Sequence, residues 1–134
     1  MKRLTIILLF TISTCVGQSS IEKNTQKLLG NWSFEQFEEA VKEGVVVTVT
    51  LTKYVENVSF QFNSDYTLDV IYSDSKKEKY FWKTNSNLIE ISPVDSENYN
   101  LRIVGEFEIF YSDNISKLYL QIKNKPHHGI KLKK

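Results

Sequence analysis

Cysteine and histidine are scarce in this chain of 134 residues, which contains one cysteine and two histidines. A single cysteine, Cys15, excludes an internal disulfide and leaves too few thiols for an iron–sulfur cluster. The histidines, His127 and His128, are adjacent in a Pro-Gly turn, where neighbouring side chains point apart. Because no third histidine or second cysteine supports them, we predict no metal site.

Excess charge of either sign is also missing, because 17 lysines and arginines face 16 aspartates and glutamates. Without Lys2 and Arg3 the balance is 15 basic against 16 acidic residues, and the one arginine left is Arg102. A nucleic-acid-binding protein normally carries a basic face. We therefore expect no nucleic-acid partner, and the lysines near the C-terminus are typical of a solubilising tail.

Catalytic motifs are lacking as well. The chain has neither a glycine-rich phosphate loop nor a Gly-x-Ser-x-Gly elbow. Two acidic pairs, Glu38-Glu39 and Glu106/Glu108, are expected on the surface, whereas acid–base catalysis needs one carboxylate removed from water. The sequence therefore predicts a protein that is not an enzyme and that holds no cofactor.

The N-terminus has the pattern of a signal peptide over residues 1–17. Lys2-Arg3 is followed by the apolar stretch Leu4–Ile12 and then by small residues up to Gly17, the usual order of an export signal. That stretch is far shorter than the roughly 20 residues that span a bilayer. We expect cleavage after Gly17, a periplasmic or secreted protein, and one domain over residues 18–134.

Cys15 leaves a second interpretation of the N-terminus open. In a lipoprotein, an acylated Cys15 would become the first residue, although Thr14 matches poorly the small residue that precedes such a cysteine. Lipid attachment would be the route to a membrane, because an acyl chain contributes about 0.8 kcal/mol per buried methylene.

A short helix is predicted before the first strand. Ser19–Glu22 resembles a capping box, and apolar residues from Ile21 to Leu29 recur at helical spacing. Gly30 is expected to end this helix, as glycine commonly does.

From Asn31 onwards the hydrophobic period changes to 2, which is typical of strands. Nine candidate strands are separated mostly by turns too short for parallel crossovers, and residues 37–44 are predicted to be a helical or irregular connector. The apolar positions of the nine candidate strands lie in Trp32–Phe34, Val45–Leu51, Val58–Phe62, Leu68–Tyr72, Tyr80–Trp82, Ile89–Ile91, Tyr99–Tyr111, Leu118–Ile122 and Ile130–Leu132.

This pattern predicts an all-β fold, an antiparallel up-and-down meander that closes into a barrel of about eight strands. Closure removes the free edges that such a long meander would otherwise leave. A two-layer sandwich is the alternative architecture. Gly105, within the longest candidate strand, is expected to mark a bend or a bulge.

A helix, then Gly30-Asn31-Trp32, then a β-meander resembles the small secreted bacterial lipocalin-like domains. The segments that carry the resemblance extend over the mature chain: Leu29–Trp32, Phe60–Asp65, Tyr80–Trp82, Leu88–Ile91, Tyr99–Leu101, Leu118–Leu120 and Ile130–Leu132. The resemblance implies a lipocalin-like barrel whose floor is closed by Gly30 and Trp32. Larger lipocalins stack a late arginine on the first-strand tryptophan, and the last two strands here contain none.

The inward parity is apolar or aromatic at every candidate position, so any ligand of the interior should be apolar or aromatic. An eight-stranded barrel is barely wide enough for its own side chains or one small ligand. Amphipathic tyrosines suit an open rim, and the connector over residues 37–44 takes the place of the lipocalin lid. The residues predicted to contact a small hydrophobic ligand are Phe60, Phe62, Tyr72, Tyr80, Trp82, Tyr99 and Leu101.

The alternative function is that of a filled barrel that binds another protein of the cell envelope. Five aromatic residues lie off the inward parity: Phe37, Tyr54, Phe81, Phe110 and Tyr119. Of these, Phe81 and Tyr119 on the outer face would form an adhesive patch.

Intact-mass measurement of the protein exported by its own host is expected to give a chain that begins at Gln18. A Cys15→Ser variant should be exported and processed to the same mass, because Cys15 is removed with the signal. A mass that corresponds to a chain starting at Cys15 with attached lipid would show the lipoprotein interpretation to be right instead.

Overall fold

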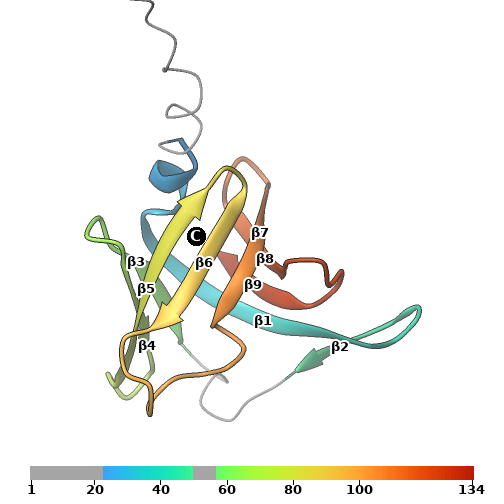
Figure 1. The fold of residues 1–134 in the computed structure, drawn as a ribbon, viewed down its shortest axis with the longest axis horizontal. Helices are drawn as coiled ribbons and strands as arrows, with labels where there is room; N and C mark the ends of the chain where they lie inside the picture. The colour runs from blue at the N-terminus through green and yellow to red at the C-terminus, as the bar shows by residue number, and fades with distance from the viewer. Residues whose placement is uncertain (1–22, 50–56) are drawn as a thin grey trace, which may run out of the picture.

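The computed structural model describes residues 23–49 and 57–134, so the predicted signal peptide, the capping box, Leu51 and Tyr54 lie outside the described residues. A helix over residues 23–28 precedes nine strands of one antiparallel sheet (Figure 1). The strands are β1 (Gly30–Lys42), β2 (Val45–Val49), β3 (Ser59–Phe62), β4 (Thr67–Ile71), β5 (Lys77–Asn85), β6 (Leu88–Pro93), β7 (Gly105–Ser112), β8 (Lys117–Ile122) and β9 (Gly129–Lys133).

The sheet closes because β1 pairs along both of its edges. Gly30–Ser33 pair with β3 on one edge, and Ser33–Glu38 pair with β9 on the other. From β3 to β9 each strand pairs with the next one in the chain. β1 and β3–β9 therefore form a closed eight-stranded antiparallel barrel, which confirms the predicted fold class.

Beyond the barrel, β1 continues and pairs with β2, from Phe37 opposite Val49 to Lys42 opposite Val45. We call Phe37–Lys42 together with β2 the arm, which projects from the barrel in Figure 1. The prediction of a helical or irregular connector over residues 37–44 is wrong up to Lys42. The valine-rich β2 supplies a ladder of backbone partners that outweighs the low strand propensity of the glutamates.

A one-residue bulge in β1 changes which side chains point inward. The register against β9 shifts between Phe34 and Gln36, so Glu35 is the extra residue. One added residue reverses the face of everything that follows it in a strand. Phe37, predicted on the outer face, is only 2% exposed and its ring centroid lies 4.7 Å from that of Phe34.

The helix covers one end of the barrel above Trp32, which is fully buried. Its indole Nε1 donates a hydrogen bond to the Leu28 carbonyl oxygen at 2.8 Å, and Gly30, with a φ of 106°, turns the chain into β1. Lys134 Nζ lies 4.7 Å from the Trp32 ring centroid. A lysine at the end of the chain thus supplies a cation over this ring.

The predicted strand over residues 99–111 begins only at Gly105, whose φ is 138°. Before it the chain turns, because Asn100 Oδ1 accepts a hydrogen bond from Arg102 N at 2.9 Å and the Asn100 carbonyl accepts one from Ile103 N at 3.0 Å. Leu101 is consequently 76% exposed, so its predicted place inside the barrel is wrong.

The alternation in Val45–Leu51 predicts that Val47, like Val49 and Leu51, points into the barrel, and for Val47 this is wrong. Val47 lies in the arm, which runs past the barrel, and its side chain is 38% exposed. In the described ranges no helix is long and apolar enough to cross a membrane.

Gly129 in β9 is a position where the fold tolerates no side chain. An added Cβ would lie 2.1 Å from the Leu120 carbonyl oxygen and 2.9 Å from Tyr119 Cε2. We expect Gly129→Ala to lower the free energy of unfolding by about 1–3 kcal/mol, as overpacking does, in a urea titration. Gly44→Ala is the control, because nothing lies within 4 Å of its added Cβ and only its φ of 75° causes strain. Equal losses in the two variants would contradict this account.

Candidate functional site

The predicted ligand-binding residues do not gather around one cavity. They are divided among the core, its lower end (the end opposite the helix) and the surface. Phe60, Phe62, Tyr80 and Trp82 are at most 2% exposed, Tyr72 is 8% exposed, Tyr99 is half-buried and Leu101 is exposed.

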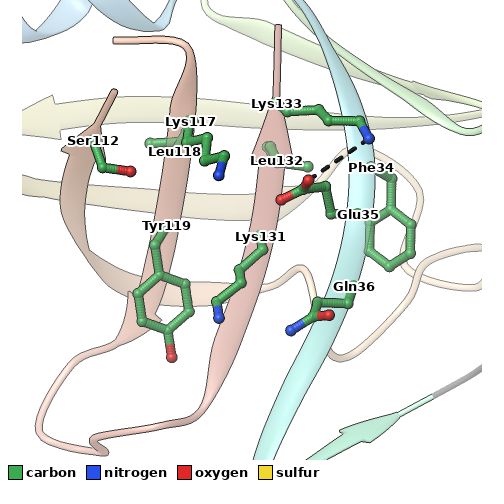
Figure 2. A pocket seen from close by; sticks show the side chains of 10 residues that line it. All are labelled: Phe34, Glu35, Gln36, Ser112, Lys117, Leu118, Tyr119, Lys131, Leu132 and Lys133. Atoms are coloured by element: carbon green, nitrogen blue, oxygen red, sulfur yellow. Dashed lines mark ion pairs between the residues drawn. The ribbon is translucent and has the colours of Figure 1, made fainter. Parts of the chain in front are cut away.

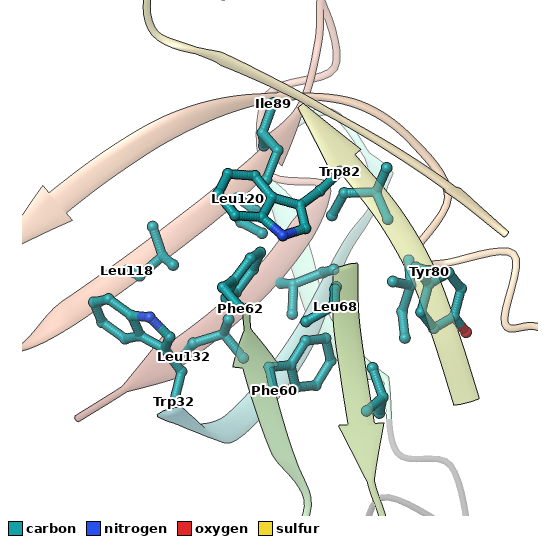
Figure 3. Packing of buried hydrophobic residues seen from close by; sticks show 14 of the residues in the cluster. Trp32, Phe60, Phe62, Leu68, Tyr80, Trp82, Ile89, Leu118, Leu120 and Leu132 are labelled. Atoms are coloured by element: carbon teal, nitrogen blue, oxygen red, sulfur yellow. The ribbon is translucent and has the colours of Figure 1, made fainter. Parts of the chain in front are cut away.

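Around Trp82, large apolar side chains from several strands gather in the interior (Figure 3). The Trp82 indole donates a hydrogen bond to the Thr67 carbonyl oxygen at 2.9 Å and packs edge-on against Phe62 with centroids 5.5 Å apart. The leucines and isoleucines that surround these rings are fully buried, among them Leu68, Ile89, Leu118, Leu120 and Leu132. Leu118 is 1% exposed and the other four are 0% exposed, so a ligand among these side chains would have to displace some of them.

An acidic side chain points into the lower end of the barrel. Glu78 is 3% exposed, opposes Val70 of β4, and has the same parity in β5 as Tyr80. The expectation that no inward position carries a charge is therefore wrong. The period-2 pattern of β5 contains the signal, because Glu78 precedes the inward Tyr80 by two residues.

Glu78 belongs to a chain of hydrogen bonds that ends in the β6–β7 loop. The Tyr80 hydroxyl donates to Glu78 Oε2 at 2.6 Å and accepts a hydrogen bond from Asn100 N at 2.9 Å. A hydrogen bond to a carboxylate is stronger than one between neutral groups. This chain therefore ties the loop to the core and makes the lower end polar, in contrast to the apolar middle.

A cleft of about 270 Å³ lies outside this end, between β1, the β6–β7 loop and the β8–β9 turn. We call it the lower cleft; its lining residues are Phe37, Glu38, Glu39, Leu101, Arg102, Ile122, Lys125, His128 and Gly129. Three of them are large and apolar, and three carry a basic group. Leu101, expected inside the barrel, instead contributes apolar surface here.

Arg102 holds the loop wall of the lower cleft to β1. Its Nη2 lies 3.3 Å from Glu39 Oε2, across 63 positions of sequence. Both side chains are partly exposed, so the ion pair is worth at most about 1 kcal/mol. No local pattern reveals a contact so distant in the chain. A second hollow of about 580 Å³ adjoins the same turn, lined by the arm with Pro126 and His127.

Figure 2 shows a third hollow, of about 540 Å³, on the outer face of β8, β9 and β1. Its lysines have acidic partners: Lys133 Nζ lies 3.7 Å from Glu35 Oε1, and Lys117 Nζ lies 3.1 Å from Asp113 Oδ2. Tyr119 leans over Gly129, and burial together with nearby Glu38 raises the pKa of its hydroxyl to about 12. This outer hollow is polar and its charges are paired, which suits an apolar ligand poorly.

Metal-binding residues do not cluster in the parts of the chain that the structure describes. No three histidine, cysteine, aspartate or glutamate side chains in residues 23–49 and 57–134 lie where they would hold an ion together. His127 and His128 fall in the β8–β9 turn, where His128 borders the lower cleft and His127 the hollow beside the arm.

Comparisons with protein-family models, with curated proteins and with solved structures give no significant match to this chain. The lipocalin-like resemblance therefore stays a prediction. The function has to be inferred from the geometry and chemistry of the barrel itself.

Removal of the Tyr80 hydroxyl is expected to destabilise the protein. Tyr80→Phe leaves Glu78 Oε2 and Asn100 N without that partner, and a lost buried hydrogen bond of this kind costs about 1–3 kcal/mol. Chemical denaturation would measure the loss.

Tyr111→Phe is the matched control, because the buried Tyr111 hydroxyl makes no hydrogen bond within residues 23–49 and 57–134 and burial raises its pKa. This variant should be as stable as the parent protein or slightly more stable. If both variants lose the same free energy of unfolding, the hydrogen bonds of Tyr80 do not tie the loop to the core.

Proposed function

We propose that this protein is an exported, non-catalytic, lipocalin-like binding protein whose ligand is a small hydrophobic molecule with an acidic group. A closed barrel is compatible with ligand binding. Export by the signal peptide over residues 1–17 and release after Gly17 are parts of the same proposal. The sequence predicts the binding site in the barrel interior, whereas we place it in the lower cleft.

The chemistry of the lower cleft is the observation that carries this proposal. Leu101 and Ile122 offer apolar surface over the buried Phe37, and Arg102, Lys125 and His128 bring nitrogen donors to the same cleft, beside Glu38 and Glu39. Ligand sites are concave and mainly apolar, with a few polar groups that orient the ligand. An apolar body with a carboxylate at one end matches this arrangement.

The packing of the interior argues against a ligand in the middle of the barrel. Phe60, Leu68 and Ile89 are fully buried, and the side chains around them already fill the space between the strands. A ligand there would have to open the barrel, whereas the lower cleft is accessible as it stands. The size of the cleft limits the ligand, or the part of it that binds, to a small molecule.

The surface carboxylates support a protein that is not an enzyme. Glu106 Oε2 lies 3.0 Å from Lys123 Nζ, and Glu108 Oε2 accepts a hydrogen bond from Gln121 Nε2 at 3.2 Å. Neither is fully buried. General acid–base catalysis by a carboxyl group needs a side chain that is removed from water.

The alternative function, a filled barrel that binds an envelope protein, draws support from the packed core. Its aromatic patch is weaker than the sequence suggests. Phe81 and Phe110 are 51% and 47% exposed, but they belong to β5 and β7, which β6 separates. Phe110 and Tyr119 face each other across β7 and β8, with ring centroids 6.4 Å apart, but Phe81 lies away from them on β5, so the three aromatic residues do not form one continuous surface.

Binding of dodecanoate, measured by its displacement of the fluorescent dye anilinonaphthalene sulfonate, tests the proposal. We expect Arg102→Gln to weaken dodecanoate binding about tenfold, the equivalent of about 1.4 kcal/mol, and to leave binding of uncharged dodecanol unchanged. Leu101→Ser should weaken both ligands, because it removes apolar contact area.

Lys83→Gln is the matched control, because it breaks a comparable surface ion pair with Glu90, 3.0 Å long, away from the cleft. Its dodecanoate affinity should equal that of the parent protein. The proposal fails if the parent protein does not bind dodecanoate, or if Arg102→Gln and Leu101→Ser bind it as tightly as Lys83→Gln does.

A further inference from the structure

The arm leaves one edge of β2 open. β2 stands first in the strand order and pairs only with β1 among the described residues. Four valines on the arm are strongly exposed: Val41 at 65%, Val45 at 37%, Val46 at 42% and Val47 at 38%. Apolar surface and unpaired backbone groups therefore coincide in one projecting element.

Such an edge is unusual in a protein that remains monomeric. Natural edge strands are protected by charged side chains, proline, bulges or a covering segment. The β2 sequence, Val-Val-Val-Thr-Val, contains no charge and no proline, and the one irregularity of the hairpin lies near its tip, between Ala40 and Lys42. A hairpin of two strands is also only marginally stable alone, so pairing of the open edge would stabilise the arm.

We propose that β2 is a dimerisation strand, which pairs antiparallel with β2 of a second copy of this chain about a two-fold axis at Val47. In this register Val45 faces Val49 of the second copy, Val46 faces Thr48, and Val47 faces its own counterpart. Each pair is β-branched on both sides, which favours cross-strand contact. No charged side chain within the strand meets a like charge.

Two further observations favour a second copy over a different protein. Strand-addition sites take their specificity for a foreign peptide from pockets for alternate side chains. Within β2 the side chains are only valine and threonine, and the hollow that Val45 and Val46 line lies at the tip of the hairpin. A two-fold interface requires only that the strand complement itself, which this register achieves. After removal of residues 1–17 the chain carries 15 basic and 16 acidic residues, a net charge of −1, so two copies repel each other little.

Disulfide trapping tests the register directly, in a Cys15→Ser background that leaves one thiol per chain. Residues directly opposite in an antiparallel pair have Cα atoms about 4.5–5.5 Å apart, within the range that a disulfide requires. Val47→Cys should therefore form a covalent dimer under mild oxidation, visible on a non-reducing gel.

Thr48→Cys and Phe81→Cys are the controls. In this register Thr48 faces Val46 of the second copy, so the two copies of residue 48 are not opposite each other. Phe81 is exposed on β5 of the barrel. Neither variant should form a covalent dimer. The proposal is overturned if all three variants cross-link equally, as random collision would produce, or if Val47→Cys does not cross-link.

Sedimentation equilibrium tests the same strand without a new thiol. The parent protein should self-associate reversibly, and Val46→Lys should shift the equilibrium to monomer, because a lysine on the edge blocks pairing. Phe81→Lys, the control on β5, should associate like the parent protein. A parent protein that stays monomeric at every concentration, or a Val46→Lys variant that associates equally well, would overturn the proposal.

Discussion

The double pairing of β1 is the constraint on which the rest of the structure depends. One strand bonds to β3 at its start, to β9 in its middle and to β2 at its end. Without β1 the remaining barrel strands would form an open sheet with exposed edges on β3 and β9. Closure satisfies those backbone groups and brings the two ends of the domain together, so the C-terminal Lys134 reaches the Trp32 ring beneath the helix.

Closure also decides where a ligand can bind. Eight strands enclose a space that their own large side chains fill, and Trp32, Phe60 and Trp82 occupy much of it. The apolar middle of the barrel stabilises the fold and excludes ligands. Polar groups gather at the lower end, where Tyr80 links Glu78 to the β6–β7 loop. The accessible chemistry of this barrel is therefore at its end and on its outside.

The sequence predicts the strands well because alternation is a local property, set by residues two positions apart. It fails where pairing with another strand, or a turn made by a polar side chain, overrides the alternation. The bulge at Glu35 reverses the parity that would place Phe37 outside, and β2 recruits a glutamate-rich segment into the arm. The turn at Asn100 removes Leu101 from the interior although its alternation continues unbroken.

The candidate site was harder to predict than the fold, for the same physical reason. Its basic and apolar groups come from segments that meet only when the barrel closes, and the contact between Arg102 and Glu39 spans 63 positions of sequence. Glu78 is the exception, because the sequence of β5 alone shows that its side chain points to the same face as that of Tyr80. Strand periodicity can therefore find a buried charge, but it cannot assemble a cleft between loops.

Three successive residues of β1 show how closely the site is tied to closure. Phe37 enters the core, Glu38 pairs with Lys131 of β9, and Glu39 pairs with Arg102 of the β6–β7 loop. A shift of one residue in the register between β1 and β9 would move all three side chains to the wrong faces. The bulge at Glu35 sets this register, so one extra residue in the strand that closes the barrel also positions one wall of the lower cleft. Beyond that wall the same strand continues into the arm, whose pairing with β2 holds the open edge away from the barrel.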